Sequence, residues 1–230
     1  YFLWNRDYKG LCDFTSVNAG VEDQMQRKLD EFPIFVRYNK AVNIIHKIRN
    51  KEKLFLPSIL SSRNPFGIPT NARGTENPFG NSYKLVSSQG DGFVEQKEII
   101  SNTSLADSYK VMITRVMCEH AGEPDKEGKF KVLATVRVLN PKEVCTDSYI
   151  TAGNFDNLNE AKNLESYLKT KFVRFLILQA AASINLSKAT YIFVPLLDFS
   201  KEWNDKTLYE RYNLSPDEIE LIDGMMHPME

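Results

Sequence analysis

The clearest architectural signal in the sequence is Leu164-Glu-Ser-Tyr-Leu-Lys-Thr-Lys-Phe-Val-Arg-Phe-Leu176. Its apolar residues recur at spacings of three and four, which indicates a helix with one buried face. An asparagine can cap the start of this helix, either Asn157 or Asn159, and we expect the helix to run to about residue 179. A helix of this length predicts a supporting element laid against a larger core.

Around this helix the sequence predicts strands and one further helix. Ser215-Pro-Asp-Glu-Ile-Glu220 places serine at a cap, proline at the first helical position and acids in the first turn, which predicts a short final helix. Apolar and β-branched residues predict strands at 83–87, 93–100, 109–117, 130–139, 144–150 and 191–197, and a hairpin of 1–5 with 11–17. We therefore expect an α+β fold, with a mixed, mainly antiparallel β core, a long supporting helix and a short C-terminal helix.

The charges are unevenly distributed although the net charge is only −1. Residues 37–84 contain nine Lys or Arg against Glu52 and Glu76, whereas residues 201–230 contain eight acids against three bases. A helix predicted from a cap at Asn39 to about residue 50 has isoleucines on one face and lysines on the others. That basic face is left either for solvent or for phosphate groups, so the first half of the chain is the part that can meet a polyanion.

Residues 58–82 lack periodicity and predict a long loop, rich in Pro, Gly, Asn and Arg. Loops of this length in compact domains are usually functional or disordered. Phe66 and Phe79, each in an Asn-Pro-Phe-Gly sequence, are expected to anchor the loop, which favours function.

The loop supplies the candidate DNA-binding residues. Arg63 and Arg73 can bond guanine or phosphate, and Asn64 and Asn71 can pair with adenine. Contacts to the DNA backbone are expected from a second group: Ser61, Ser62, Thr70 and Lys84. His120, in a separate polar connection, can contact a base or a carboxylate. The alternative is that the asparagines and serines only build turns and cap helices.

No catalytic, cofactor-binding or metal-binding residue can be assigned from the sequence. Three cysteines without CxxC spacing and three scattered histidines argue against disulfides and structural zinc, and fit a reducing cytoplasm. No apolar run reaches the roughly 18 residues of a membrane span. No glycine-rich loop for S-adenosylmethionine or nucleotide phosphate is present. Glu95-Gln-Lys97 resembles half of a metal-dependent nuclease site, but a plain strand with alternating Phe93, Glu95 and Lys97 explains the segment without chemistry and is preferred.

Several blocks of the sequence occur in an order that carries a family resemblance: Val144-Cys-Thr-Asp-Ser-Tyr-Ile150, the helical stretch 164–176, Phe193-Val-Pro-Leu-Leu-Asp-Phe-Ser-Lys201, Leu208-Tyr-Glu-Arg-Tyr-Asn-Leu214, and at the amino-terminal side Tyr1-Phe-Leu-Trp-Asn-Arg-Asp-Tyr8 and Ser61-Ser-Arg-Asn-Pro-Phe-Gly67. Together they resemble the carboxyl-terminal region of adenine-specific DNA methyltransferases of type II restriction-modification systems, of the type IIG-like kind. The resemblance spans most of the chain.

The resemblance implies a target recognition domain, which binds duplex DNA while a preceding S-adenosylmethionine-dependent domain, absent here, methylates adenine N6. The chain would then be a fragment of a methyltransferase, and enzymes of this kind can also carry a fused endonuclease. Residues 1–57 would be the end of the catalytic region with a basic connecting helix, 58–200 the recognition domain, and 201–230 an acidic tail with a short helix. The alternative is an assembly domain that docks a nuclease or methyltransferase subunit through the helix at 159–179.

Overall fold

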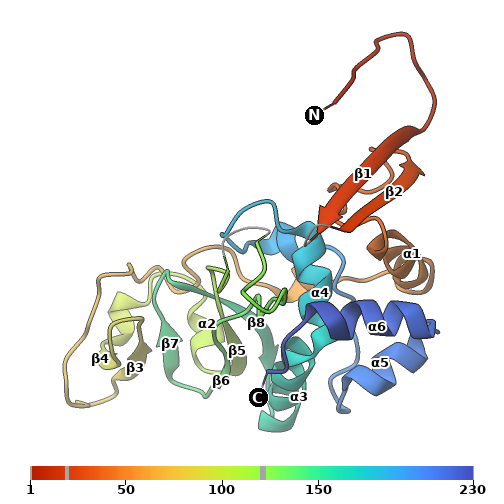
Figure 1. Ribbon diagram of the computed structural model, residues 1–230. Coiled ribbons are helices and arrows are strands. Elements are labelled where there is room, and N and C mark those ends of the chain that lie inside the picture. The colour runs from red at the N-terminus through yellow and green to blue at the C-terminus, as the bar shows by residue number, and fades with distance from the viewer. Residues whose placement is uncertain (1, 19–20, 120–122, 230) are drawn as a thin grey trace.

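The computed structural model describes residues 2–18, 21–119 and 123–229 and has a mixed α+β fold, as the sequence predicts (Figure 1). The helices are α1 (Ala41–Lys51), α2 (Thr103–Ala106), α3 (Leu158–Lys169), α4 (Lys171–Ala180), α5 (Asp205–Arg211) and α6 (Pro216–Met225), with short 3-10 helices η1 (Leu56–Ile59), η2 (Gln96–Glu98) and η3 (Lys188–Tyr191). The strands are β1 (Cys12–Asn18), β2 (Val21–Arg27), β3 (Tyr83–Val86), β4 (Gly92–Val94), β5 (Tyr109–Thr114), β6 (Val136–Leu139), β7 (Glu143–Cys145) and β8 (Tyr149–Phe155).

The strands form three small sheets, in the orders β1-β2, β4-β3-β7 and β6-β5-β8. All pairings are antiparallel except that of β3 with β7. The predicted mainly antiparallel core is confirmed. In Figure 1 the β1-β2 hairpin projects from the helical side of the protein, while β4-β3-β7 lies at the opposite end.

The central sheet β6-β5-β8 separates two hydrophobic cores. Val111 and Ile113 of β5 belong to the larger core with the helices, whereas Met112, between them, belongs to the smaller core with β3, β4 and β7. Successive side chains of a strand point to opposite faces, so β5 contributes to both cores. The loop after η1 closes the smaller core with Phe66, which is fully buried.

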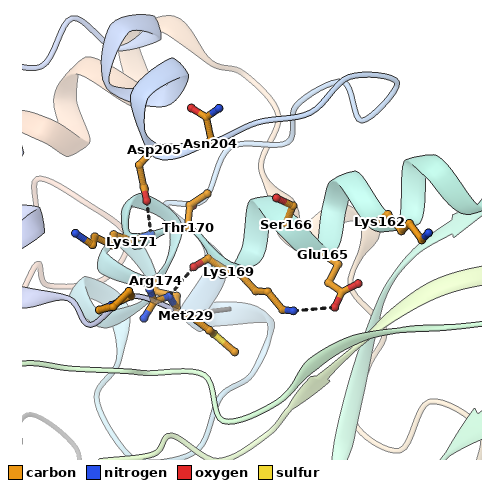
Figure 2. Close-up of a pocket in the computed structure, with 11 residues that line it drawn as sticks. Lys162, Glu165, Ser166, Lys169, Thr170, Lys171, Arg174, Asn204, Asp205 and Met229 are labelled. Carbon is orange, nitrogen blue, oxygen red and sulfur yellow. Dashed lines mark hydrogen bonds and ion pairs between the residues drawn. The ribbon is translucent and has the colours of Figure 1, made fainter.

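The predicted helix at 157–179 is two helices, because the chain breaks at Thr170. Asn157 caps α3 as predicted, since its side chain accepts from Glu160 N at 2.9 Å. Thr170 is extended, with ψ 149°, and its hydroxyl accepts from Val173 N at the start of α4. Asp205 accepts from the N–H group of Lys171 (Figure 2) and from that of Phe172, and thereby satisfies two donors that a helix start leaves open.

Helix α4 is buried on every side. All nine residues from 172 to 180 are buried, including Arg174 and Gln179. An amphipathic supporting helix was expected, but α4 packs against α3, α5, α6 and η3. An α-helix that is covered on all sides needs apolar residues on all faces. Residues 172–178, with the sequence Phe-Val-Arg-Phe-Leu-Ile-Leu, supply them.

The acidic carboxyl-terminal segment packs into the larger core. Ser215 caps α6 as predicted, accepting from Glu218 N, and α5 precedes it where no helix was expected. The segment's buried side chains include Trp203, Leu208, Ile222 and Met226, and they share the core with Ile44 and Ile48 of α1. The three-part division into 1–57, 58–200 and 201–230 stays a prediction.

Five strand predictions were wrong in place or extent. Residues 2–5 form no strand, and β1 pairs instead with β2, with Cys12 opposite Arg27. The strand predicted at 191–197 starts at Tyr191, the last residue of η3, and continues as an irregular segment. Most of its apolar residues are buried, and within the described part of the chain its bridge to another segment is that of Pro195 with Phe55. Of the strand predicted at 130–139 only β6 is formed, because Val132 has φ +68°, which ends regular pairing.

The other two predicted strands are shortened by turns. After Val94, Glu95 starts the 3-10 helix η2, and its carboxylate pairs with Lys97 at 2.6 Å on the surface. The segment 144–150 is the end of β7, a turn and the start of β8. The turn between β7 and β8 holds Asp147 and Ser148.

Candidate nucleic-acid interface

The loop after η1 is ordered by its contacts with β8 and the smaller core. Ser61 N donates to Thr151 O, and Thr151 N donates to Ser61 Oγ, so the loop starts as an addition to the edge of β8. Asp147 N donates to Ile68 O further along. Phe66 anchors the loop as predicted, whereas the prediction for Phe79 was wrong, because Phe79 is 37% exposed.

Arg63 is held on the surface by a carboxylate from the β7-β8 turn. Its Nε and Nη2 donate to Asp147 Oδ2 at 3.1 and 3.0 Å, and 73% of its side chain is exposed. The hydrogen bond to Asp147 raises the pKa of Arg63, so this guanidinium is always charged. Arg115, after β5, donates to the same carboxylate at 2.7 Å. Asp147 therefore positions two arginines.

Arg73 is held by backbone carbonyls and by the β3-β4 turn. Its Nη1 donates to Thr70 O at 3.0 Å and Ala72 O at 2.8 Å, and its Nη2 donates to Gln89 Oε1. The backbone at Arg73 passes close to β4, because a Cβ on Gly92 would lie 1.9 Å from Arg73 O. Only glycine at position 92 allows this approach.

The two arginines belong to one surface, because the turns that hold them touch. Ser88 Oγ lies 3.5 Å from Ser148 Oγ, and these serines are the chain neighbours of Gln89 and Asp147. We call this the turn surface and define it by Arg63, Arg73, Ser88, Gln89, Asp147 and Ser148.

The other predicted site residues are placed differently. Ser62, Thr70 and Asn71 are exposed on the same loop. Ser61 is occupied by its bonds to β8. Asn64 has φ +54° and is half-buried in a turn, and its Oδ1 has no hydrogen-bond partner among the described residues. His120 lies outside the described residues.

Lys84 is less suited to phosphate than expected. Its ammonium group lies 3.2 Å from the carboxylate of Asp91 and 3.7 Å from that of Glu143. Two acids compensate one lysine, so the potential around Lys84 is not the positive one that its sequence neighbourhood indicates.

The basic face of α1 is largely used inside the protein. Lys47 donates to Glu218 at 2.6 Å and to Asn213 O at 2.8 Å, and Lys51 donates to Arg211 O at 2.8 Å. The expectation that this face is left for solvent or phosphate was therefore wrong for Lys47, whereas Lys51 remains exposed. The partners come from the acidic carboxyl-terminal segment.

Asn39 does not cap α1. Its amide instead donates to Phe14 O and Asp23 O, which fastens the β1-β2 hairpin to the body of the protein. The cap position is Lys40, whose side chain makes no capping bond.

Sequence reasoning missed Arg115, Gln89, Asp147 and Ser148. The signal for Gln89 was its turn sequence, Ser87-Ser-Gln-Gly-Asp-Gly92, which is typical of a tight connection. No local pattern marks Asp147 as the partner of an arginine 84 residues away.

Comparison with models of known protein families finds no match, and comparison with curated protein sequences finds none either. In the described ranges 2–18, 21–119 and 123–229, no helix is long and apolar enough to cross a membrane. The same ranges hold no group of three or more His, Cys, Asp or Glu side chains arranged for a metal ion.

Proposed function

We propose that this chain recognises a specific sequence in duplex DNA, as the target recognition domain of an adenine-specific DNA methyltransferase. The observation that carries the proposal is the turn surface, where an exposed arginine is held by a carboxylate at the junction of three turns. A preorganised guanidinium loses less conformational entropy on binding than a mobile side chain.

The geometry of Arg63 fits guanine. A guanidinium has five N–H donors, and Arg63 uses Nε and Nη2 on Asp147 while Nη1 makes no hydrogen bond within the described part of the chain. One N–H of Nη1 and the second N–H of Nη2 remain as two parallel donors. This pair matches the two acceptors O6 and N7 of guanine.

Arg73 has a different part in the proposal. Both of its Nη groups are occupied, and its bond to Gln89 Oε1 leaves the amide nitrogen of Gln89 as a donor. Arg73 therefore positions Gln89, and Thr70 and Asn71 on the same turn supply exposed polar groups beside it.

The local charge favours a polyanion. Arg63, Arg73 and Arg115 give three positive charges in and beside the turn surface. The acids there are Asp147 and, in the same β3-β4 turn as Gln89, Asp91, whose carboxylate pairs with Lys84. Such a surface attracts phosphates at low salt. The methyl donor of the proposed whole enzyme is S-adenosylmethionine, bound by the catalytic domain that the resemblance implies, and cleavage by a fused endonuclease belongs to the same proposal.

The proposed alternative, an assembly domain, keeps only part of the surface first assigned to it. The half of the predicted helix that forms α4 is buried, so it offers no docking face. A nuclease or methyltransferase subunit would have to dock on the exposed side of α3, where Asn159 and Lys162 lie, or elsewhere.

The test is selection from a pool of random duplexes at low and moderate salt, followed by sequencing of the bound DNA. We expect enrichment of one short site containing a guanine. Arg63→Ala should then weaken binding to that site by roughly 10-fold to 100-fold, the value of one bidentate base contact.

Arg6→Ala is the matched control, because Arg6 is 80% exposed and also pairs with an acid, Asp7, but lies before the hairpin. Equal affinity of Arg63→Ala and Arg6→Ala for the selected site would refute the role of Arg63. If the unaltered chain binds no duplex DNA even at low salt, where phosphate binding is strongest, a protein partner is favoured instead.

A further inference from the structure

A second exposed element continues the turn surface at the end of β5. Residues 182–185 are all exposed, and their loop is bonded to the chain after β5. Met117 N donates to Ile184 O at 2.8 Å, and Leu186 N donates to Arg115 O at 2.7 Å. Val116 and Asn185 form an antiparallel bridge between these bonds. The two segments thus make a short two-stranded ribbon.

The ribbon has an inner and an outer face. Met117 and Leu186 are 5% and 2% exposed, so they point into the larger core. Val116 lies between the core-facing positions and is 46% exposed, and Asn185, opposite it, is exposed too. Side chains directly opposite in an antiparallel pair share a face, with Cβ atoms about 5 Å apart. The outer face therefore presents one apolar and one amide side chain together.

The ribbon is joined to the turn surface through Arg115. The guanidinium of Arg115 donates to the carboxylate of Asp147, which also holds Arg63, and Arg115 N donates to Ser148 O at 3.2 Å. Lys188, the first residue of η3 after this loop, adds a positive charge, and residues 182–188 contain no acid. Val116 and Asn185 are thus the outward side chains of the ribbon that Arg115 joins to the turn surface, and the guanidinium of Arg115 leaves from the opposite side of the ribbon.

We propose that Val116 and Asn185 together read one A·T base pair in the major groove. An asparagine amide pairs with N6 and N7 of adenine, and the thymine of the same pair presents a methyl group beside them, the only apolar group of the groove. The major groove admits a two-stranded ribbon, which is the form of this element. This inference rests on the proposed function and adds the base pair that is read beside the contact of Arg63.

The test uses the duplex obtained by selection, with each thymine replaced in turn by uracil, which lacks only the methyl group. At one position we expect affinity to fall about threefold to fourfold, the effect of one buried methyl group. Val116→Ala should bind the thymine and uracil duplexes equally at that position. Asn185→Ala should weaken binding roughly tenfold or more and accept other bases there.

Val17→Ala is the matched control, because Val17 is also an exposed valine, at 62%, on the separate β1-β2 hairpin. It should retain the difference between thymine and uracil. Thermal unfolding of each variant separates loss of folding from loss of contact.

The outcomes distinguish the two proposals. Site-specific binding that depends on Arg63, with no effect of uracil at any position and none of Val116→Ala, overturns the inference and leaves the proposed function standing. A selected site without an A·T pair does the same. Absence of site-specific binding overturns the proposed function, and the inference with it.

Discussion

Replacing Arg174 with methionine should lower the free energy of unfolding by about 2–4 kcal/mol. Arg174 is fully buried and ties three segments together through its guanidinium. It donates to Lys169 O at 3.0 Å, to Lys131 O at 3.0 Å and to His227 O at 2.6 Å. Methionine retains much of the aliphatic stem but donates no hydrogen bond, so three carbonyl groups lose a donor.

The magnitude follows from opposing effects. A buried acceptor without a partner costs about 1–3 kcal/mol, so three would cost roughly 3–9 kcal/mol if none found a new donor. Two effects reduce this. The charge of Arg174 is itself unfavourable inside the protein, as the lowering of its pKa by burial shows. Arg174 also lines an open hollow of about 460 Å³ (Figure 2), so in the variant a water molecule at this position could replace part of the lost donors.

Urea unfolding, followed by fluorescence and by circular dichroism, measures the change. The slope against urea should stay constant if only stability is altered. Lys162→Met is the control, because Lys162 lines the same hollow but is exposed, and it should change stability by less than about 0.5 kcal/mol. A stability of Arg174→Met equal to that of the control would refute the role assigned to the three carbonyl bonds.

Three further predictions concern charged side chains. Asp147→Asn should weaken binding to the selected duplex several-fold while binding stays salt-dependent, because Arg63 loses its charged support; unchanged affinity in a titration would contradict this. A double-mutant cycle of Lys47→Met and Glu218→Gln should give a coupling free energy of unfolding of about 1 kcal/mol that falls with added salt. Zero coupling would mean that the two side chains lie close together without stabilising the fold. Burial lowers the pKa of Lys110 to about 8 from 10.5, so the folded state releases this proton at lower pH than the unfolded state does. The stability of the unaltered protein relative to Lys110→Met should therefore rise between pH 8 and 10.5, by at most about 3 kcal/mol, and a difference that falls with pH in urea unfolding would contradict the sign.

Elements with a local cause were predictable from the sequence. The caps at Asn157 and Ser215 act on N–H groups three residues away, so a window of a few residues contains the whole interaction. The strand cores of β3 and β5 also follow from local alternation and β-branched content.

Elements whose form depends on distant packing were not predictable. The break at Thr170 is stabilised by Asp205, 34 and 33 residues beyond the two N–H groups that it accepts. The segment at 191–197 is apolar because it is buried among helices, and burial alone does not distinguish a strand from an irregular chain. Strand β2 is mostly polar because its hairpin projects into solvent, so it had no apolar signal.

The candidate site also has residues that were predictable from the sequence and residues that were not. The composition of the loop, with its arginines among turn residues, identified Arg63 and Arg73 as candidates. The sequence did not identify what positions them, because Asp147 and Gln89 lie in turns of other strand pairs and reach the loop only when the sheets assemble.

The sequence by itself determined the α+β composition, the two capped helix starts and the polar loop that carries Arg63, since each depends on neighbouring residues. Only the tertiary structure decided how the charges are used. Lys47 of the basic helix α1 and Glu218 of the acidic carboxyl-terminal segment neutralise one another. Arg63 and Arg115 share one acid, Asp147, so these three side chains together carry a net positive charge. The physical reason is that a charge acts through distance and burial, which the fold sets and the order of residues does not.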